Sequence, residues 1–371
     1  MLKILSVFGT RPEAIKMAPI VHELERRQDQ IESRVCVTAQ HREMLDQVLD
    51  IFDIRPDHDL HIMKKNQRLA GVTAAVFSRL DPVLERERPD WMLVQGDTTT
   101  VMAASLVAYY HRCRVGHIEA GLRTGDKYHP FPEEINRRVA SVAADLNFCP
   151  TQVTRENLLR EGVRPEQIVV TGNTVIDALF IALKKPHDVL TSPLAGVPLD
   201  DRRVILVTAH RRENFGRPLE NICHSLRQIA ETYPDVQLIY PVHLNPHVQE
   251  PVHRLLRDTP GISLLPPLDY LSFVNLMNRA ELVLTDSGGL QEESAGLHKP
   301  VLVMRETTER PEAVTAGVSQ VVGTDSARIV AAASRLLDDP DTYRRMASAP
   351  NPYGDGTAAR QIIDALLAYT D

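Results

Sequence analysis

The feature that most constrains this chain is the repeated alternation of short apolar runs with amphipathic stretches along its 371 residues. Runs rich in β-branched residues predict strands, and stretches whose apolar residues recur every three or four positions predict helices. Strands that alternate with helices in this way form parallel sheets covered by helices. We therefore predict an α/β fold built on doubly wound parallel sheets.

The predicted strands fall into two groups, one in each half of the chain. The first group lies near residues 3–9, 34–39, 91–96, 115–119, 146–149 and 168–171. The second group lies near residues 203–208, 236–241, 262–265, 282–285, 301–304 and 320–322. Helical patterns such as 12–27 and 133–144 separate the strands, and the second half repeats the architecture of the first.

A chain of this length exceeds what one hydrophobic core usually serves, so we predict two domains. Residues 186–201 contain three prolines and a glycine, have no clear periodicity, and are predicted to form a connector. The predicted domains are 1–172 and 173–356, both Rossmann-like. The final amphipathic stretch, 357–371, is too short to be a domain and is predicted to pack on the first one.

Composition excludes several functional classes. The net charge of −7 gives no general attraction to nucleic acid or to anionic lipid, so a bound phosphate must be held by locally placed cations and amides. The four cysteines are scattered without a CxxC pair, which is typical of reduced, buried thiols in a cytoplasmic protein. No leader peptide or membrane-spanning segment is apparent, so we expect a cytoplasmic location.

Polar residues gather directly after the predicted strands, where ligands bind in open parallel sheets. After the first strand, Thr10 and Glu13 fit a capping box with Pro12 at the first helical position. Arg11 and Lys16 then lie beside a helix N-terminus, an arrangement that suits a diphosphate. The same residues are equally compatible with a capped helix that carries two surface cations.

Two acidic residues follow the next strands of the first half. Asp97 precedes three threonines and either caps the following helix or acts on a ligand. Glu119 ends an apolar strand, and a carboxylate there needs a partner or a raised pKa, which favours a functional role over an ion pair with Arg123. His117 beside Glu119 suggests a metal, but no third ligand follows at a recognisable spacing.

Glu133 follows prolines at 130 and 132, which predict an extended approach to the next helix and place this carboxylate in its first turn. The helix dipole favours a carboxylate there in any case, so capping and chemistry both remain open for Glu133.

The second half offers a matching set of post-strand residues. His210 opens a dense polar loop, 209–214. Asp286 leads into Ser287, Gly288 and Gly289, whose small side chains let backbone amides approach a phosphate. Glu293 lies one turn further and is placed to accept hydrogen bonds from a ribose, and Arg310, in a charged loop, is placed to reach a uracil or phosphate. A single Ser-Gly-Gly turn is weak support for this.

Together these segments resemble the non-hydrolysing UDP-N-acetylglucosamine 2-epimerases along essentially the whole chain. The matching segments are GTRPEAIKMAP (9–19), TAQHREMLDQVL (38–49), GDTTT (96–100), HIEAGLRTGD (117–126), PEEINR (132–137), TGNTVIDAL (171–179), HRRENFG (210–216), YPVHLNP (240–246), TDSGGLQEE (285–293) and TTERPEAV (307–314). Gln95 departs from the family pattern, in which a His is more usual.

The resemblance implies two Rossmann-like domains that face each other across a cleft, as in glycosyltransferases of the B type, and a homodimer without NAD or metal. It implies reversible conversion of UDP-GlcNAc to UDP-ManNAc, which supplies ManNAc units for bacterial surface polysaccharide. By position it points to Asp97, Glu119, Glu133 and His210 as catalytic residues. The nucleotide would be held by Arg11, Lys16, Phe273, Ser287, Gly288, Gly289, Glu293 and Arg310, with His210 beside them.

Members of this family also bind a second UDP-GlcNAc as an allosteric activator. The positions that match this second site are Gln40, Glu43, Asn66, Glu133, Arg211 and His243. Glu43 and Asn66 stand where some members carry Gln and Arg, so a carboxylate replaces an amide and a cation near the diphosphate is lost. We therefore expect activation by UDP-GlcNAc to persist but to require a higher concentration.

Three alternatives remain open from the sequence. The chain could be a hydrolysing epimerase, or an epimerase of a modified UDP-amino sugar. It could be a glycosyltransferase of the same fold, which fold alone cannot exclude. It could also be a nucleotide-sugar sensor without turnover. Three carboxylates disfavour the last two, since inverting transfer needs one base and sensing needs none.

Overall fold

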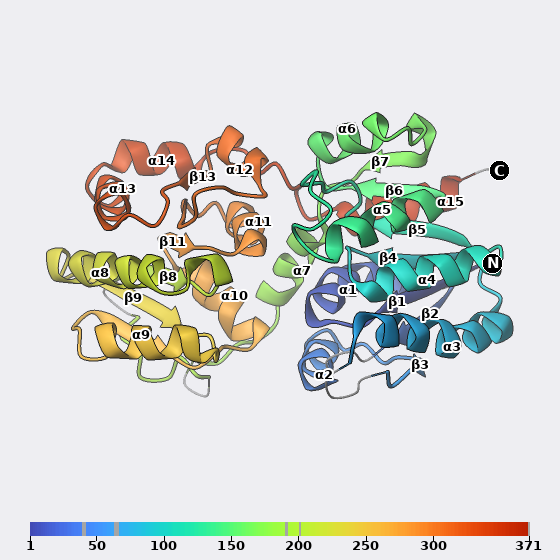
Figure 1. The fold of residues 1–371 in the computed structure, drawn as a ribbon, viewed down its shortest axis with the longest axis horizontal. Helices are drawn as coiled ribbons and strands as arrows, with labels where there is room; N and C mark the ends of the chain where they lie inside the picture. The colour runs from blue at the N-terminus through green and yellow to red at the C-terminus, as the bar shows by residue number, and fades with distance from the viewer. Residues whose placement is uncertain (39–41, 63–66, 190–191, 200–201, 370–371) are drawn as a thin grey trace. The chain divides into compact units, whose positions relative to one another are not determined.

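The computed structural model describes residues 1–38, 42–62, 67–189, 192–199 and 202–369. These residues form two compact units, each an α/β structure with its own core (Figure 1). Unit 1 comprises Met1–Ile181 and Tyr353–Asp371, and unit 2 comprises Ala182–Pro352. Within the described ranges, no helix is both long and apolar enough to cross a membrane.

Unit 1 contains a parallel sheet whose strands are ordered β3-β2-β1-β4-β5-β6-β7. Its strands are β1 (Leu2–Phe8), β2 (Ile31–Val37), β3 (His58–Asp59), β4 (Trp91–Gln95), β5 (Arg114–Ile118), β6 (Leu146–Cys149) and β7 (Ile168–Val170). Its helices are α1 (Arg11–Arg26), α2 (Arg42–Ile51), α3 (Leu69–Glu87), α4 (Thr99–Tyr110), α5 (Glu133–Ala143), α6 (Gln152–Arg160), the 3₁₀ turn η1 (Pro165–Gln167), α7 (Thr174–Leu183) and α15 (Ala358–Ala368).

The helices of unit 1 cover its sheet in two groups. Helix α1 contacts α2 and α15, whereas α4 contacts α3 and α5. The strands between them are almost continuously apolar, and β4 is buried along its whole length, as expected for parallel strands covered on both faces. One core cluster of unit 1 joins β1, β4 and β5 to α3 and α4.

Unit 2 repeats this plan with a parallel sheet ordered β10-β9-β8-β11-β12-β13. Its strands are β8 (Arg203–Thr208), β9 (Val236–Pro241), β10 (Ile262–Leu265), β11 (Leu282–Thr285), β12 (Val301–Val303) and β13 (Ser319–Val321). Its helices are the 3₁₀ turn η3 (Arg212–Asn214), α8 (Arg217–Thr232), α9 (Pro246–Leu256), α10 (Tyr270–Arg279), α11 (Gly288–Gly296), α12 (Pro311–Ala316), α13 (Ser326–Asp338) and α14 (Pro340–Ala347).

The predicted α/β class with two parallel sheets is confirmed, and every predicted strand has a counterpart at nearly the predicted residues. The short strand β3 was missed because two residues carry no periodicity. The units divide after Ile181 and after Pro352, whereas the sequence placed boundaries at 172/173 and 356/357.

Helix α7 explains why the first division lies later in the chain. The Asp177 carboxylate accepts the backbone N–H groups of Ala358 (3.3 Å) and Ala359 (2.9 Å), so it caps the N-terminus of α15. The backbone N–H of Asn173 also donates to Tyr353 O at 2.7 Å. Through these contacts the first turns of α7 pack with the C-terminal segment, and both belong to unit 1.

Candidate functional site

Each sheet has a switch point, where neighbouring strands connect to helices in opposite directions. In unit 1 it lies between β1 and β4, and in unit 2 between β8 and β11. Loops that leave the carboxyl ends of such strands diverge and leave a crevice for ligands. The predicted residues Arg11, Asp97, His210 and Ser287 all lie in or directly after these loops. Within each unit, the strand order therefore places the predicted residues at the same edge of the sheet.

The loop after β1 is held by the predicted capping box, which is present in full at the start of α1. Glu13 Oε2 accepts the backbone N–H groups of Gly9 (2.8 Å) and Thr10 (2.7 Å). Its other oxygen accepts the hydroxyl of Thr98 at 2.5 Å, a contact that the sequence did not indicate. Burial raises the pKa of Glu13. This carboxylate therefore ties the β1 loop to the β4 loop that carries Asp97.

The Glu119 carboxylate is buried and paired with a cation. Its side chain is 5% exposed, and its Oε2 lies 2.5 Å from Lys16 Nζ. Gln95 Nε2 donates to the same oxygen. The backbone of Glu119 is left-handed, with φ of 61°, which is costly for a residue with a side chain and is concentrated at functional sites.

The alternative ion pair between Glu119 and Arg123 is wrong. Arg123 Nη2 instead lies 2.7 Å from Glu161 Oε2. Lys16, expected to face a diphosphate, is bound to Glu119 in this structure. The half-buried Arg11 stands at the first position of α1, and Pro12, predicted for that position, is the second residue of the helix.

Asp97 is held by helix α5. Its Oδ2 lies 2.5 Å from Arg137 Nη2, and its carbonyl accepts from Asn136 Nδ2 at 3.0 Å. The side chain is 30% exposed, so Asp97 remains accessible to a ligand while its charge is balanced. The sequence did not single out Arg137 or Asn136, because helical spacing alone does not say which loop a helix faces.

Glu133 is the first residue of α5 and is half-buried. The extended approach predicted for it is wrong: Pro132 has φ of −92° and ψ of 8°, and the chain turns into the helix. Proline fixes φ but leaves ψ free to adopt a turn. The neighbouring Glu134 is fully buried and was missed. It accepts the backbone N–H of Thr124 at 3.1 Å and anchors the 124–125 loop beside α5.

His117 is a structural histidine. Its Nε2 lies 2.7 Å from Gly96 O, so this nitrogen must donate, and its Nδ1 lies 3.5 Å from Ser141 Oγ. Burial lowers the pKa of His117 to about 4. Across the residues that the structure describes, no group of three or more His, Cys, Asp or Glu side chains is placed to hold a metal.

The four cysteines are buried free thiols, as predicted. Burial raises the pKa of each to about 12, so the thiols stay protonated and unreactive near neutral pH.

In unit 2, Asp286 organises the loops after β8 and β11. It is fully buried, and its Oδ2 accepts the backbone N–H groups of His210 and Arg211, each at 2.8 Å, and Asn214 Nδ2 at 3.0 Å. The His210 ring stacks on His243, with ring centroids 5.4 Å apart and planes inclined by 15°. Sequence reasoning placed His210 at the site but gave Asp286 no role.

Helix α11 starts at Gly288 with Ser287 as its N-cap, and the Ser287 side chain makes no capping hydrogen bond. The Ser287 amide donates to Thr285 Oγ1 at 2.9 Å, whereas the helical amides from Gly288 onward are not capped by the Ser287 side chain and can face an anion. A side chain at Gly289 would meet no atom within 4 Å, and the Arg211 guanidinium lies 3.8 Å from where a Cβ of Gly288 would stand. A cation thus lies beside the helix start.

The remaining predicted residues of unit 2 lie in α10, in α11 and directly before α12. Glu293 is buried in α11, and its Oε1 accepts the hydroxyl of Tyr270, a residue that the sequence did not indicate, at 3.2 Å. Phe273 is half-buried in α10. Arg310 donates through Nε to the buried Glu292. This pairing fixes the direction of the guanidinium.

The second-site residues are described only in part. Gln40 and Asn66 lie outside the described residues, and Glu43 belongs to α2 but its side chain is not described. In unit 2, the backbone N–H of Arg211 donates to Asp286, and the His243 ring stacks on His210.

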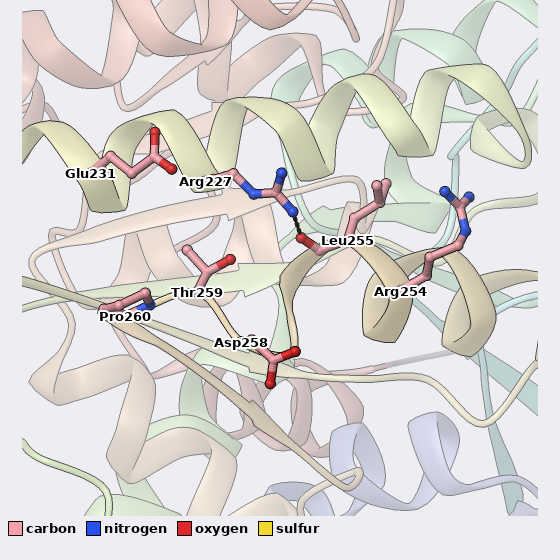
Figure 2. Close-up of a pocket in the computed structure, with 7 residues that line it drawn as sticks. All are labelled: Arg227, Glu231, Arg254, Leu255, Asp258, Thr259 and Pro260. Carbon is pink, nitrogen blue, oxygen red and sulfur yellow. Dashed lines mark hydrogen bonds between the residues drawn. The ribbon is translucent and has the colours of Figure 1, made fainter.

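A separate hollow of about 270 Å³ lies on unit 2 between the end of α8 and the end of α9 (Figure 2). It is lined by Arg227, Glu231, Arg254, Leu255, Asp258, Thr259 and Pro260. None of these is a predicted site residue, and the guanidinium of Arg227 is bound to the carbonyl of Leu255. We assign no function to this hollow.

Comparison with known proteins identifies the family. The family model described as UDP-N-acetylglucosamine 2-epimerase matches residues 22–367. The UDP-N-acetylglucosamine 2-epimerase of Escherichia coli K12 is 56% identical over 370 residues, which cover 98% of each chain. The chain therefore aligns with a relative along nearly its full length.

Two solved structures agree with this. The UDP-GlcNAc 2-epimerase of Neisseria meningitidis bound to UDP-GlcNAc is 48% identical with a TM-score of 0.90, covering 99% of this chain and 100% of that one. The enzyme of Methanocaldococcus jannaschii in complex with UDP-GlcNAc and UDP is 32% identical with a TM-score of 0.80, again covering 99% and 100%. Sequence and fold together show that this chain belongs to the UDP-N-acetylglucosamine 2-epimerase family.

Proposed function

We propose that this protein interconverts UDP-GlcNAc and UDP-ManNAc without net hydrolysis. The observation that carries the proposal is the pair of charge-balanced carboxylates at neighbouring strand ends, Asp97 with Arg137 and Glu119 with Lys16. They follow β4 and β5, which are adjacent in the sheet. Acid–base chemistry on a sugar needs more than one positioned carboxylate, and this edge of the sheet supplies them.

The chemistry requires activation of the sugar, because the C2 hydrogen does not stand beside a carbonyl. In the proposed route the C1–O bond breaks with its electron pair passing to UDP, while a carboxylate takes the C2 proton. The products are UDP and 2-acetamidoglucal. UDP then adds back to C1, and a proton delivered to the opposite face of C2 gives the epimer. Asp97, Glu119 and Glu133 are the proposed acid and base groups.

The departing UDP needs stabilisation of its diphosphate charge. Unit 1 offers Arg11 and Lys16 for this charge, and unit 2 offers His210 and the amides of Gly288 and Gly289, with Arg211 beside the helix start. Phe273, Glu293 and Arg310 complete the proposed nucleotide contacts. No cofactor is needed, because the nucleotide itself is the leaving group.

Lys16 has two roles in this proposal, as the partner of Glu119 and as a cation for the diphosphate. In the present structure it neutralises Glu119 at 2.5 Å. A bound diphosphate would compete for the same ammonium, which would free the Glu119 carboxylate to act as a base. Nucleotide binding and activation of the carboxylate would then occur together.

The protein is further proposed to act as a homodimer. Tyr109 and Tyr110 at the end of α4 are 67% and 68% exposed, and Val142 in the adjacent α5 is 87% exposed. The Tyr110 ring also contacts Phe77 of α3, with centroids 6.0 Å apart. Exposed aromatic and aliphatic groups on contacting helices are typical of a protein interface. Sedimentation should show a dimer that Tyr109→Lys and Tyr110→Lys together dissociate, and a monomeric parent would refute it.

We also propose that UDP-GlcNAc binds a second site as an activator and that the product serves surface-polysaccharide synthesis. Arg211 and His243, two of the residues assigned to the second site, lie beside His210 in unit 2. An effector held by them would be coupled to the residues assigned to the nucleotide. Coupling of this kind must be reciprocal between substrate and effector.

The proposal is tested by incubating the protein with UDP-GlcNAc alone and following the anomeric signals by NMR. Signals of UDP-ManNAc growing to a constant ratio with UDP-GlcNAc, without free sugar, would support it. Free ManNAc and UDP in equal amounts would indicate a hydrolysing enzyme. An unchanged spectrum would favour a glycosyltransferase that lacks its acceptor or a sensor, and would contradict the proposal.

A further inference from the structure

Asp286 of unit 2 has one carboxylate oxygen that nothing in the described residues satisfies. The side chain is fully buried, and Oδ2 accepts three N–H groups from His210, Arg211 and Asn214. Oδ1 is also buried, and within the described part of the chain it has no hydrogen-bond partner. Leaving a buried carboxylate oxygen without a donor is costly, so such an atom calls for an explanation.

The group nearest to supplying that donor is the His210 ring. His210 Nδ1 lies 3.7 Å from Asp286 Oδ1, which is too long for a hydrogen bond but close enough for a small movement of the ring to form one. The His210 side chain is 37% exposed, and its ring stacks on His243. His210 can therefore turn toward Asp286 and still present Nε2 outward.

The surroundings of His210 shift its pKa in opposite directions. Burial lowers the pKa of His210, Asp286 acts to raise it, and His243 and the adjacent Arg211 lower it further. The ring is therefore neutral near neutral pH in the absence of a ligand. An added anion in front of Nε2 would favour the protonated form.

The backbone places this pair at the start of α11. Asp286 directly precedes Ser287, and by accepting the His210 and Arg211 amides it holds that loop beside the first helical turn. A diphosphate bound at the amides of Gly288 and Gly289 would also lie near the negative charge of Asp286. Protonation of His210 would neutralise that charge and add a donor on the ligand side.

We propose that Asp286 is a positioning residue that holds His210 with Nδ1–H toward Oδ1, so that Nε2 takes up one proton from solvent when the diphosphate of a nucleotide sugar binds. The proton is released when the nucleotide leaves, and no covalent bond changes. This inference rests on the proposed function, because it uses the nucleotide site assigned to unit 2.

The coupling is tested by calorimetric titration of the whole protein with UDP-GlcNAc near pH 7, in buffers of different ionisation enthalpy. UDP-GlcNAc carries no terminal phosphate monoester, and epimerisation takes up no net proton, so the buffer-dependent part of the heat reports proton uptake on binding. We expect uptake approaching one proton and a Kd that rises close to tenfold per pH unit above neutrality. Binding without proton uptake would overturn this inference alone. Absence of binding would overturn the proposed function as well.

Asp286→Asn separates the carboxylate charge from its structural role. The asparagine oxygen can still accept the three N–H groups, but its amide would donate to Nδ1 and leave Nε2–H as a neutral donor. Proton uptake should fall to near zero and the pH dependence of Kd should flatten. His210→Asn should also abolish uptake, whereas His224→Asn, an exposed histidine in α8, should leave it unchanged. Uptake that persists in Asp286→Asn would refute the proposal.

A spectroscopic measurement keeps the test independent of variant folding. In protein labelled with ¹⁵N-histidine, the His210 resonance is identified by its loss in His210→Asn. Addition of UDP-GlcNAc near pH 7 should move Nε2 from the shift of an unprotonated nitrogen to that of a protonated one. A Nε2 that stays unprotonated in the complex would contradict the mechanism.

Discussion

Removing Lys16 should destabilise unit 1 by an amount set by the burial of its partner. Glu119 is 5% exposed and Lys16 15%, so Lys16→Met removes the cation from a buried carboxylate that still accepts from Gln95. Breaking a buried pair from one side costs about 3–5 kcal/mol. Glu119→Gln should cost less, about 1–2 kcal/mol, because the more exposed Lys16 can extend toward water.

The double variant Lys16→Met/Glu119→Gln should be more stable than Lys16→Met alone, because it contains no stranded charge. The cycle should yield a coupling free energy of about 2–3 kcal/mol. Lys16→Arg keeps the charge and serves as the matched control. It should lose less stability than Lys16→Met.

The single tryptophan makes the measurement specific to unit 1. Trp91 lies in β4, is 1% exposed and contacts Tyr369 and Arg114 of the same unit. Its fluorescence during urea denaturation therefore reports the unfolding of unit 1. One contrary result is a free energy of unfolding of Lys16→Met that differs from that of the parent by less than about 1 kcal/mol, and another is a coupling free energy near zero. Either result would show that the pair behaves as a surface ion pair and would refute our account of Glu119.

Three further predictions follow from the site and its supports. UDP should raise the thermal midpoint by binding the folded state, and this rise should be smaller in Arg310→Ala. Arg310→Ala/Glu292→Gln controls for the lost pairing, and an unchanged rise would remove Arg310 from the site. Burial raises the pKa of Asp177 to about 6, so its contribution to stability is full below the unfolded value near 4 and is lost as pH rises through 6. The free energy of unfolding should therefore fall by about 2–3 kcal/mol more in the parent than in Asp177→Asn between pH 4 and pH 7, and parallel curves would contradict this. The double variant Glu43→Gln/Asn66→Arg should lower the UDP-GlcNAc concentration that half-activates the reverse reaction by roughly tenfold. If this variant needs as much activator as the parent, the second-site assignment is wrong.

The strands and their parallel arrangement were predictable because strands buried on both faces are continuous apolar runs. The capping box at Thr10 and Glu13 was also predictable, since it depends on residues three positions apart. These features are local. Strand β3 escaped prediction because a two-residue strand has no pattern to detect.

The partners within the site were not predictable in the same way. Lys16 and Glu119 are 103 positions apart, and their contact depends on the order of strands in the sheet rather than on spacing. The partner that sequence spacing offered, as the alternative to a functional role, was Arg123, four residues away. The left-handed backbone of Glu119 leaves no compositional trace either, because that conformation usually marks a glycine.

The role of Asp286 was hidden for a related reason. In the sequence it is only the residue before a Ser-Gly-Gly turn. Its function follows from three N–H groups donated by a loop more than seventy positions earlier in the chain. Conversely, Asp97, Glu119 and His210 could be located because polar residues directly after apolar strands fall at the ligand-binding edge of a parallel sheet.

The most direct test of the account is turnover of UDP-GlcNAc in deuterated water. If a carboxylate removes the C2 proton and exchanges it with solvent, the UDP-ManNAc formed must carry deuterium at C2, as NMR or mass spectrometry will show. Asp97→Asn should abolish this incorporation while UDP still binds. Epimerised product that retains protium at C2 would indicate a shielded proton or a hydride route and would contradict the elimination mechanism.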